Sequence, residues 1–256
     1  MTLHPLPAFT DNYIWLVHNG REALVVDPGD AAPVLEALGR IGLALHTILV
    51  THHHSDHTGG VAELRNATGA KVYGPAYETM PEPLTRVGEG DTVRGPDGLG
   101  FQVIEVPGHT AGHIAYYAAP AGEHPILFCG DTLFSAGCGR LFEGTPAQML
   151  DSLGKLAALP GNTRVCCTHE YTLSNLRFAL AIEPDNQALQ DYATHCQDLR
   201  ARGLPTLPSS VALEQNINPF LRSHLESVGS RVRAHDPQGA ADRGVFAALR
   251  EWKNTF

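Results

Sequence analysis

The chain has 256 residues, of which 43% are hydrophobic and 18% charged, a composition typical of a globular protein with a sizeable core and one or two domains. The net charge of −9 and the lack of any dense basic run argue against a nucleic-acid partner, because phosphate binding needs clustered Lys and Arg. No apolar run could cross a bilayer, and the first residues do not resemble a secretory signal, so we expect a cytoplasmic monomer without a membrane partner.

The first two-thirds of the chain alternate short β-like runs with turns and helices. The runs are rich in Val, Ile, Tyr and Phe, end at Gly, Pro or Asp, and predict eight strands: Tyr13–Val17, Ala23–Val26, Thr47–Val50, Lys71–Tyr73, Phe101–Val106, Ile114–Tyr117, Ile126–Cys129 and Arg164–Cys167. Three helices are predicted between them: Ala32–Arg40, Gly59–Thr68 and Pro146–Ala158. This mixture predicts an α/β (α+β) fold with two sheets covered by helices.

Two stretches of the chain share a loose pattern. In the first, a strand ends at Asp27 and the next central strand ends at Thr51-His52. In the second, a strand ends at Asp131 and a later one at His169. Two similar halves would each place an Asp and a His at the carboxyl ends of strands, where sites form in layered α/β folds.

The character of the chain changes after His169. Three helices are predicted in this part: Thr172–Ile182, Asp185–Arg202 and Ala241–Phe256. Gly203 ends the second of them, and a Pro-rich turn follows. We therefore predict two domains, one over residues 1–170 and a helical lobe over residues 171–256.

The five cysteines do not indicate a structural role. Their number is odd and no C-x-x-C pair is present, so we expect reduced thiols, as in cytosolic proteins. A catalytic thiol is the alternative, and it is weaker because another motif already supplies a nucleophile.

That motif lies within Thr51–Gly60, where four potential metal ligands fall in six residues: His52, His54, Asp56 and His57. Imidazole suits zinc, iron and similar ions, and a carboxylate suits harder metals. Ligands this close together can be divided between two adjacent ions, an arrangement typical of hydrolysis by an activated water.

Three further ligands follow predicted strands, at His109, Asp131 and His169. We predict that His52, His54 and His109 hold one metal and that a second is held by Asp56, His57 and His169. Asp131 can bridge both ions, because a carboxylate has two oxygens, and a hydroxide shared by the ions is the predicted nucleophile. Asp27 is either an orienting residue or a structural turn residue. His113 either orients the site or packs, and His53 is expected to point away from its neighbours.

The segment His52-His53-His54-Ser55-Asp56-His57 resembles the H-x-H-x-D-H signature of the metallo-β-lactamase superfamily, which implies an αββα sandwich with metals at one edge. Other segments resemble the glyoxalase II (hydroxyacylglutathione hydrolase) family: Phe9–Tyr13, Gly130–Phe134, Gly137–Arg140, Phe142–Thr145, Thr168–Thr172 and Asn218–Arg222. This resemblance covers nearly the whole chain. It implies hydrolysis of S-D-lactoylglutathione (an S-2-hydroxyacylglutathione) to glutathione and D-lactate, the second step of methylglyoxal detoxification.

The resemblance also implies substrate contacts. Arg140 and Tyr171 match positions that hold the glutathione part of the substrate, and Arg250 and Lys253 match a pair that binds its glycine carboxylate. Spacing alone allows the last two to be a solvated helix end. Phe142 departs from relatives that carry a tyrosine, which removes one possible hydroxyl contact.

With these implications we predict a thioester hydrolase with two divalent metal ions, in which Asp56 and Asp131 serve the shared hydroxide. Zinc is the expected metal, and iron or manganese would also suit the ligands. The main alternative is a persulfide dioxygenase with a single iron from the same superfamily. A β-lactamase, a nuclease and a non-catalytic metal-binding module are weaker alternatives.

Overall fold

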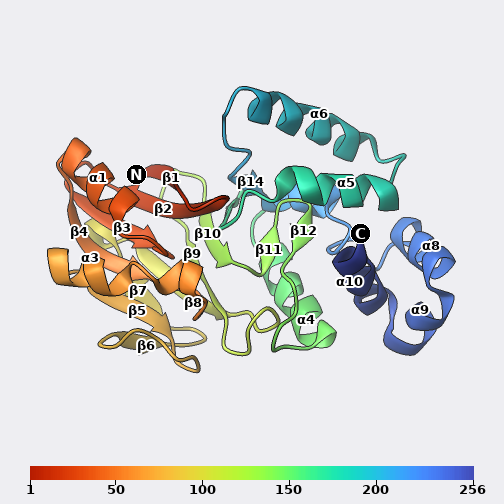
Figure 1. The fold of residues 1–256 in the computed structure, drawn as a ribbon, viewed down its shortest axis with the longest axis horizontal. Helices are drawn as coiled ribbons and strands as arrows, with labels where there is room; N and C mark the ends of the chain where they lie inside the picture. The colour runs from red at the N-terminus through yellow and green to blue at the C-terminus, as the bar shows by residue number, and fades with distance from the viewer.

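Two six-stranded sheets packed face to face form the centre of the molecule, in a computed structural model that describes residues 1–256 (Figure 1). The first sheet has six strands in sequence order: β1 Thr2–Ala8, β2 Asn12–His18, β3 Glu22–Val26, β4 Ala44–Leu49, β5 Lys71–Pro75 and β6 Thr85–Val87. The second has the order β14-β13-β10-β9-β8-β7, with these bounds: β7 Thr92–Arg94, β8 Gly100–Glu105, β9 Ile114–Ala118, β10 Ile126–Gly130, β13 Arg164–Cys167 and β14 Ser209–Ser210. A two-stranded hairpin, β11 Leu133–Phe134 with β12 Gly137–Cys138, follows β10.

Strand β2 shows how the layers are built. Every one of its residues is buried. Trp15 faces the core between the sheets, where Phe128 of the second sheet lies against it, and Leu16 faces the opposite core. Because successive side chains of a strand point to opposite faces, a strand that is buried throughout must be covered on both sides.

The outer face of the first sheet is covered by α1 Ala32–Ile41 and α3 Val61–Thr68. Val34 and Leu38 of α1 and Leu64 of α3 belong to the same buried cluster as Ile48 of β4. Each such buried aliphatic side chain contributes about 1.5–3 kcal/mol of transfer free energy. Helix α1 ends at Gly42, whose φ of 77° is the left-handed conformation that glycine adopts readily.

Helix α4 Pro146–Ala157 belongs to the core on the side of the second sheet, and its start is fixed by a capping box of Thr145 and Gln148. The layers are therefore helix, sheet, sheet and helix. The predicted αββα sandwich is confirmed.

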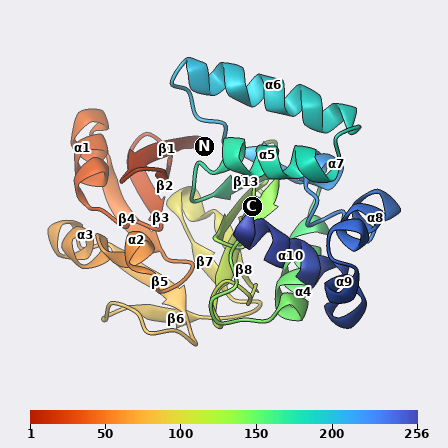
Figure 2. The ribbon, with the colours of Figure 1, turned by 45° about the vertical axis from the view of Figure 1, so that its right-hand side comes forward.

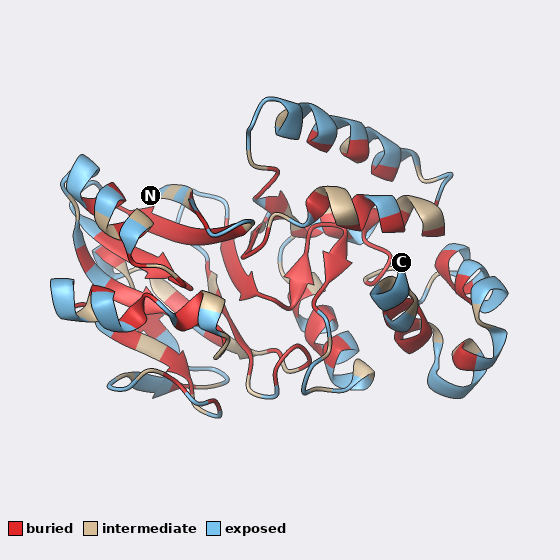
Figure 3. Ribbon diagram, viewed as in Figure 1, coloured by how far each residue is buried: buried red, intermediate tan, exposed pale blue.

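After β13 the chain is almost entirely helical (Figure 2). The helices in this part are α5 Thr172–Ile182, α6 Gln187–Ala201, α7 Val211–Ile217, α8 Glu226–His235, α9 Pro237–Arg243 and α10 Val245–Thr255. Figure 3 shows that α6 is exposed on its outer side, whereas its inner side carries the buried Leu189, Ala193 and Cys196. Phe178 of α5 and Phe246 of α10 belong to the same core cluster as the sheets. The helical lobe therefore shares a hydrophobic core with the sandwich and is not joined to it by a linker alone.

All eight predicted strands and the five predicted helices before residue 203 are present, with small shifts of their ends. The helix predicted over Ala241–Phe256 is wrong in its first residues, because Gly244, with a φ of 85°, separates α9 from α10. Strand β1 was not predicted because it contains Pro5 and Pro7. It lies at the edge of its sheet and pairs only with β2, a position where proline is tolerated. No helix is long and apolar enough to span a bilayer.

Candidate metal centre

Two parallel strand pairs deliver the residues of the site. Strand β3 pairs in parallel with β4, and β10 pairs in parallel with β13. Asp27 and Thr51 follow the first pair, and Asp131 and His169 follow the second. Thr51 donates to Asp27 through its backbone N–H, at 2.7 Å, and through its hydroxyl, at 2.8 Å. The pattern repeated in the sequence thus corresponds to two equivalent strand ends that meet at one edge of the sandwich.

Close approach of these strand ends requires glycine at Gly130. Its φ is 49°, and a Cβ there would lie 2.3 Å from Thr51 Oγ1 and 2.7 Å from the His113 ring. The left-handed conformation turns the chain sharply before Asp131. Asp27, the residue that follows β3, also has a positive φ, of 52°.

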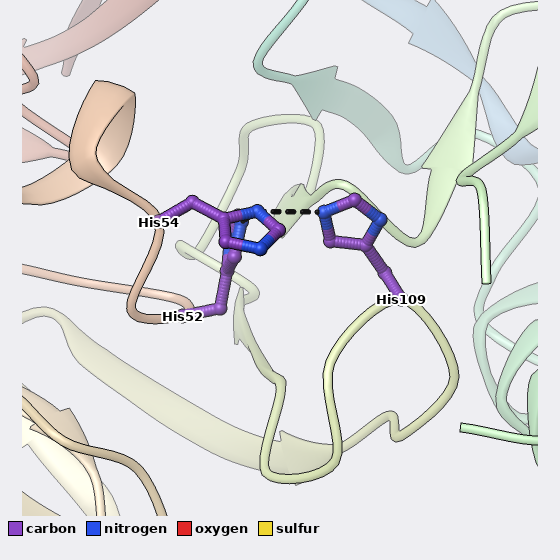
Figure 4. A group of neighbouring side chains, drawn as sticks. All are labelled: His52, His54 and His109. Carbon is purple, nitrogen blue, oxygen red and sulfur yellow. Dashed lines mark hydrogen bonds between the residues drawn. The ribbon is translucent and has the colours of Figure 1, made fainter. Parts of the chain in front are cut away.

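Three imidazoles form the first ligand cluster (Figure 4). His54 Nδ1 lies 3.1 Å from His52 Nε2 and 3.0 Å from His109 Nε2. Donor atoms around a tetrahedral zinc ion with bonds of 2.0–2.1 Å lie roughly 3.3–3.4 Å from one another. The three nitrogens therefore have nearly the separations that one bound ion would impose.

Asp56, His57 and His169 form the second cluster. Asp56 Oδ2 lies 3.5 Å from Nε2 of both His57 and His169. Helix α2 Ser55–Thr58 places Asp56 and His57 next to each other, and His169 approaches from the other sheet.

Asp131 joins the two clusters through its two oxygens. Oδ1 lies 3.5 Å from His57 Nε2 and 3.4 Å from His169 Nε2. Oδ2 lies 3.4 Å from His109 Nε2. One oxygen therefore faces each cluster, which is the geometry of a bridging carboxylate.

Buried polar atoms without partners test whether metal ions fit this site. Both ring nitrogens of His57 and Oδ1 of Asp131 are buried and accept or donate no hydrogen bond within the protein. Nδ1 of His57 lies 3.2 Å from Asp27 Oδ2, but without hydrogen-bond geometry. Since buried polar groups are almost always paired, unsatisfied atoms that point at one another fit a cation between them.

Outer contacts orient most of the imidazoles. His109 Nδ1 lies 2.8 Å from the carbonyl oxygen of Arg140, and His169 Nδ1 lies 2.7 Å from Asp11 Oδ1. His52 Nδ1 lies 3.1 Å from the hydroxyl of Thr51. Such partners fix the ring and the tautomer of a metal-binding histidine.

The electrostatics of the cluster favour ionised carboxylates. The His57 ring, with Nε2 3.5 Å from Oδ2 of Asp56, holds the pKa of Asp56 below its usual range. Burial alone would raise the pKa of Asp131, but the charges of His57 and His169 outweigh burial and lower it. For the fully buried His52, burial and the neighbouring imidazoles depress the pKa, so this ring is neutral and available as a ligand.

The two clusters lie at a cavity of about 540 Å³, a volume typical of small-molecule sites. Nine residues line it: His54, Asp56, His109, Asp131, Phe134, Arg140, Phe142, His169 and Tyr171. A larger hollow of about 780 Å³ near Glu183 and Arg222 contains no group of metal ligands.

Comparison with known proteins places this geometry in a family. The family model described as "Metallo-beta-lactamase superfamily" matches residues 8–169, and the one described as "Hydroxyacylglutathione hydrolase C-terminus" matches residues 170–256. A hydroxyacylglutathione hydrolase of Albidiferax ferrireducens is 66% identical over 256 residues, which cover all of both chains. The chain belongs to the hydroxyacylglutathione hydrolase family.

Solved structures with the same fold extend the comparison beyond this hydroxyacylglutathione hydrolase family. The crystal structure of ETHE1 from Myxococcus xanthus has a TM-score of 0.65 and 26% identity, and the match covers 100% of this chain and 99% of that one. The crystal structure of TTHA1623, in a di-iron-bound form, has a TM-score of 0.62 and 27% identity. That match covers 86% of this chain and 100% of the other.

Two of the four substrate residues implied by the resemblance to hydroxyacylglutathione hydrolases line the cavity. The Tyr171 ring is stacked on His169 with centroids 4.6 Å apart, and Arg140 is exposed. Arg250 and Lys253 do not line it. Arg250 is buried and donates to the carbonyl oxygen of Cys138 at 2.9 Å, only two residues before Arg140.

Other residues behave in ways that the sequence left open. His113 orients the site, because its Nε2 accepts a hydrogen bond of 3.1 Å from the backbone N–H of Asp131. Asp11, which holds His169, was missed as a separate site residue, although it lies in one of the motifs shared with the family. All five cysteines are free and buried, and burial raises the pKa of the Cys129 and Cys167 thiols well above the usual value. These thiols are unreactive for that reason.

Proposed function

We propose that this protein hydrolyses S-D-lactoylglutathione and related S-2-hydroxyacylglutathiones to glutathione and a 2-hydroxy acid, here D-lactate, in methylglyoxal detoxification. The observation that carries the proposal is the pair of ligand clusters joined by Asp131 at an open cavity. The family membership of the whole chain supports the choice of a glutathione thioester as substrate.

The proposed ligands of the first ion are His52, His54 and His109, and those of the second are Asp56, His57 and His169, with Asp131 shared. Two such ions supply an acidified water and an electrophile for the thioester carbonyl. Zinc is the proposed metal, although imidazole and carboxylate ligands also accept iron and manganese.

Asp56 and Asp131 have different proposed tasks. Asp131 is buried and holds the two clusters at a fixed separation. The side chain of Asp56 is 41% exposed and faces the cavity, so it can accept a hydrogen bond from the attacking water and orient it. Asn12 Nδ2 donates to Asp56 Oδ2 at 3.1 Å and thereby fixes the direction of this carboxylate.

The leaving group places few demands on the protein. A thiol of pKa near 8.5 leaves as a thiolate without a strong general acid. Burial and nearby carboxylates raise the pKa of Tyr171, so this residue stays protonated and can donate a hydrogen bond to the substrate. Arg140 adds a positive charge to the cavity lining, which suits an anionic substrate.

Arg250 and Lys253 are proposed to bind the glycine carboxylate of the glutathione part. Neither has a carboxylate within ion-pair distance, and Nε of Arg250 is buried without a partner. Burial and the charge of Arg250 lower the pKa of Lys253. Two adjacent cations without a counter-ion favour an anionic ligand, because an added negative charge relieves their repulsion.

The decisive experiment measures release of glutathione from S-D-lactoylglutathione, together with elemental analysis of the purified protein. We expect two metal ions per chain and turnover. Asp131→Ala should lower metal occupancy and reduce activity more than about 100-fold, whereas Asp151→Ala, on the exposed side of α4, should behave as wild type. Full activity of the Asp131 variant would contradict the mechanism, and one iron per chain with oxygen uptake would favour the dioxygenase.

Three further points rest on the sequence and stay predictions. We propose that residues 1–170 and 171–256 are two domains, that the protein is a monomer, and that it is cytoplasmic. Size-exclusion chromatography with light scattering tests the second of these directly.

A further inference from the structure

His54, like His57, has no outer hydrogen bond that orients its ring. Its Nδ1 faces His52 and His109, but its outer nitrogen Nε2 has no hydrogen-bond partner in the protein. The rings next to it are those of His53, at 5.0 Å between centroids, and the exposed Phe142, at 5.6 Å. Its direction must therefore be set by the backbone and by its neighbours rather than by its own hydrogen bond.

The neighbour His53 is held between two carboxylates. Its Nδ1 lies 2.9 Å from Glu78 Oε2, and its Nε2 lies 3.3 Å from Glu143 Oε1. Glu78 is almost fully buried, with 8% of its surface exposed. His53 therefore points away from the metal centre, as expected, but its ring contacts Glu78 and Glu143 rather than solvent alone.

The same two carboxylates also hold the loop that carries His109. Oε1 of Glu78 accepts hydrogen bonds from the Thr110 hydroxyl and, at 3.1 Å, from the N–H of Gly112. Oε2 of Glu143 accepts from the N–H of Ala111 at 2.8 Å. One buried carboxylate therefore joins the loop of His52 and His54 to the loop of His109.

The segment that carries Glu78 is closely packed. A Cβ on Gly112 would lie 2.7 Å from Glu78 Cγ and 3.1 Å from the backbone of Tyr77. Arg86 of β6 donates to the carbonyl oxygens of Ala76 and Glu78, at 3.1 and 2.8 Å. The segment that carries Glu78 is thus fixed from both sides.

We propose that Glu78 is a positioning residue of the first metal site: through His53, Thr110 and Gly112 it sets the separation of His54 and His109. The inference rests on the proposed two-metal centre. The inference implies that a change at Glu78 affects the two metal sites unequally, because Glu78 contacts neither Asp56, His57 nor His169. Loss of Glu78 should weaken the first site and spare the second.

The test compares zinc occupancy at the two sites in crystals of Glu78→Ala, Glu78→Gln and the wild type, equilibrated with zinc buffers and measured by anomalous diffraction. We expect Glu78→Ala to raise the dissociation constant of the first site by about tenfold or more, with the second site nearly unchanged. Glu78→Gln keeps the acceptor for Thr110 and Gly112 and should restore part of the affinity. If the alanine variant does not fold, the glutamine variant alone provides the test.

Glu183→Gln is the matched control. Glu183 is buried to a similar extent, with 6% exposed, and it also accepts several hydrogen bonds, but from Arg222 and Ser227 rather than from the metal loops. It should leave both occupancies unchanged. Equal loss at the two sites, or no loss, in the Glu78 variants would overturn the inference while leaving the proposed function intact. A wild-type protein that binds no zinc would refute the metal centre itself.

Discussion

The metal edge of the sandwich and the helical lobe fix their functional groups in different ways. At the metal edge each carboxylate and most imidazoles touch a second buried group, such as Asp27 beside Thr51 or Asp11 beside His169. In the lobe, Lys253 makes no hydrogen bond or ion pair, and its Nζ lies 5.3 Å from the centroid of the Phe178 ring. From this comparison we expect the metal edge to be held rigidly before a substrate binds, and we expect the lobe to complete its contacts only with the proposed substrate.

The largest effect is expected on the free energy of unfolding, when the packing between the sandwich and the lobe is disrupted. Phe220 is completely buried, belongs to the core shared with the sheets, and lies 5.0 Å under the guanidinium of Arg250. Phe220→Ala should lower the free energy of unfolding by about 3–5 kcal/mol. Because the lobe and the sandwich share this core, we expect one unfolding transition in urea, followed by far-UV circular dichroism.

Metal content measured along the same urea titration provides the control for Phe220→Ala. If the lobe unfolds first in this variant while two metal ions stay bound, the two regions are energetically separate and the shared core does not couple them. Phe256→Ala, at an exposed aromatic residue of the same lobe, should have a much smaller effect.

Residues whose role depends on neighbours close in the sequence were predicted better than residues whose partners lie far along the chain. The residues that the structure gathers into the two candidate ligand clusters were predicted, because strands ending in Asp or His have a local signature and parallel strands bring such ends together. Asp11 and Glu78 were not predicted as site residues, because their partners lie 158 and 25 to 34 residues away along the chain. Contacts of that kind come from tertiary packing, which the spacing of residues along the chain does not predict.

The helices of the lobe were predicted only in part from the sequence. Helices α7, α8 and α9 were not predicted, and α10 was predicted with a start four residues too early, at Ala241. The spacing predicts that Val245, Leu249, Trp252 and Phe256 share the buried face of α10. This is right for Leu249, which is fully buried, and for Val245 and Trp252, which pack on the core, but Phe256 is 59% exposed. The role of Arg250 depends on a contact with Cys138, more than a hundred residues earlier, which spacing cannot reveal.

An intermediate effect is expected for substrate binding in the lobe. Lys253→Met removes the charge while keeping most of the apolar contact with the Phe178 ring. Loss of a hydrogen bond to a charged group is worth about 1.5–3 kcal/mol, so KM for S-D-lactoylglutathione should rise about tenfold or more. Metal content and kcat should stay near the wild-type values, because Lys253 does not line the cavity.

Lys155→Met serves as the control for this variant, since Lys155 lies on α4 and pairs with Glu89 rather than with the substrate region. A fall in kcat without a change in KM for Lys253→Met would show that the lobe acts on the chemistry and not on binding. In that case the contrast between a rigid edge and an adaptable lobe would be wrong.

The smallest effect concerns a pairing inside the lobe whose strength depends on pH. Arg222 donates to Glu183 through Nε and Nη2, at 2.7 and 2.9 Å, and Ser227 donates to the same carboxylate. Burial by itself would raise the pKa of Glu183, but these hydrogen bonds outweigh burial and lower it. Ionised Glu183 is therefore favoured in the folded state relative to the unfolded chain.

Because the folded pKa is depressed, this contribution to stability is fully present above the unfolded value of about 4.3 and disappears as the pH falls through the lower folded value. Glu183→Gln should lower the free energy of unfolding by about 1 kcal/mol at pH 7. The difference from wild type should shrink as the pH falls below about 4. Urea denaturation of both proteins at several pH values measures this. A constant difference down to the acid limit would mean that shape and packing of the side chain, and not its charge, stabilise this part of the lobe.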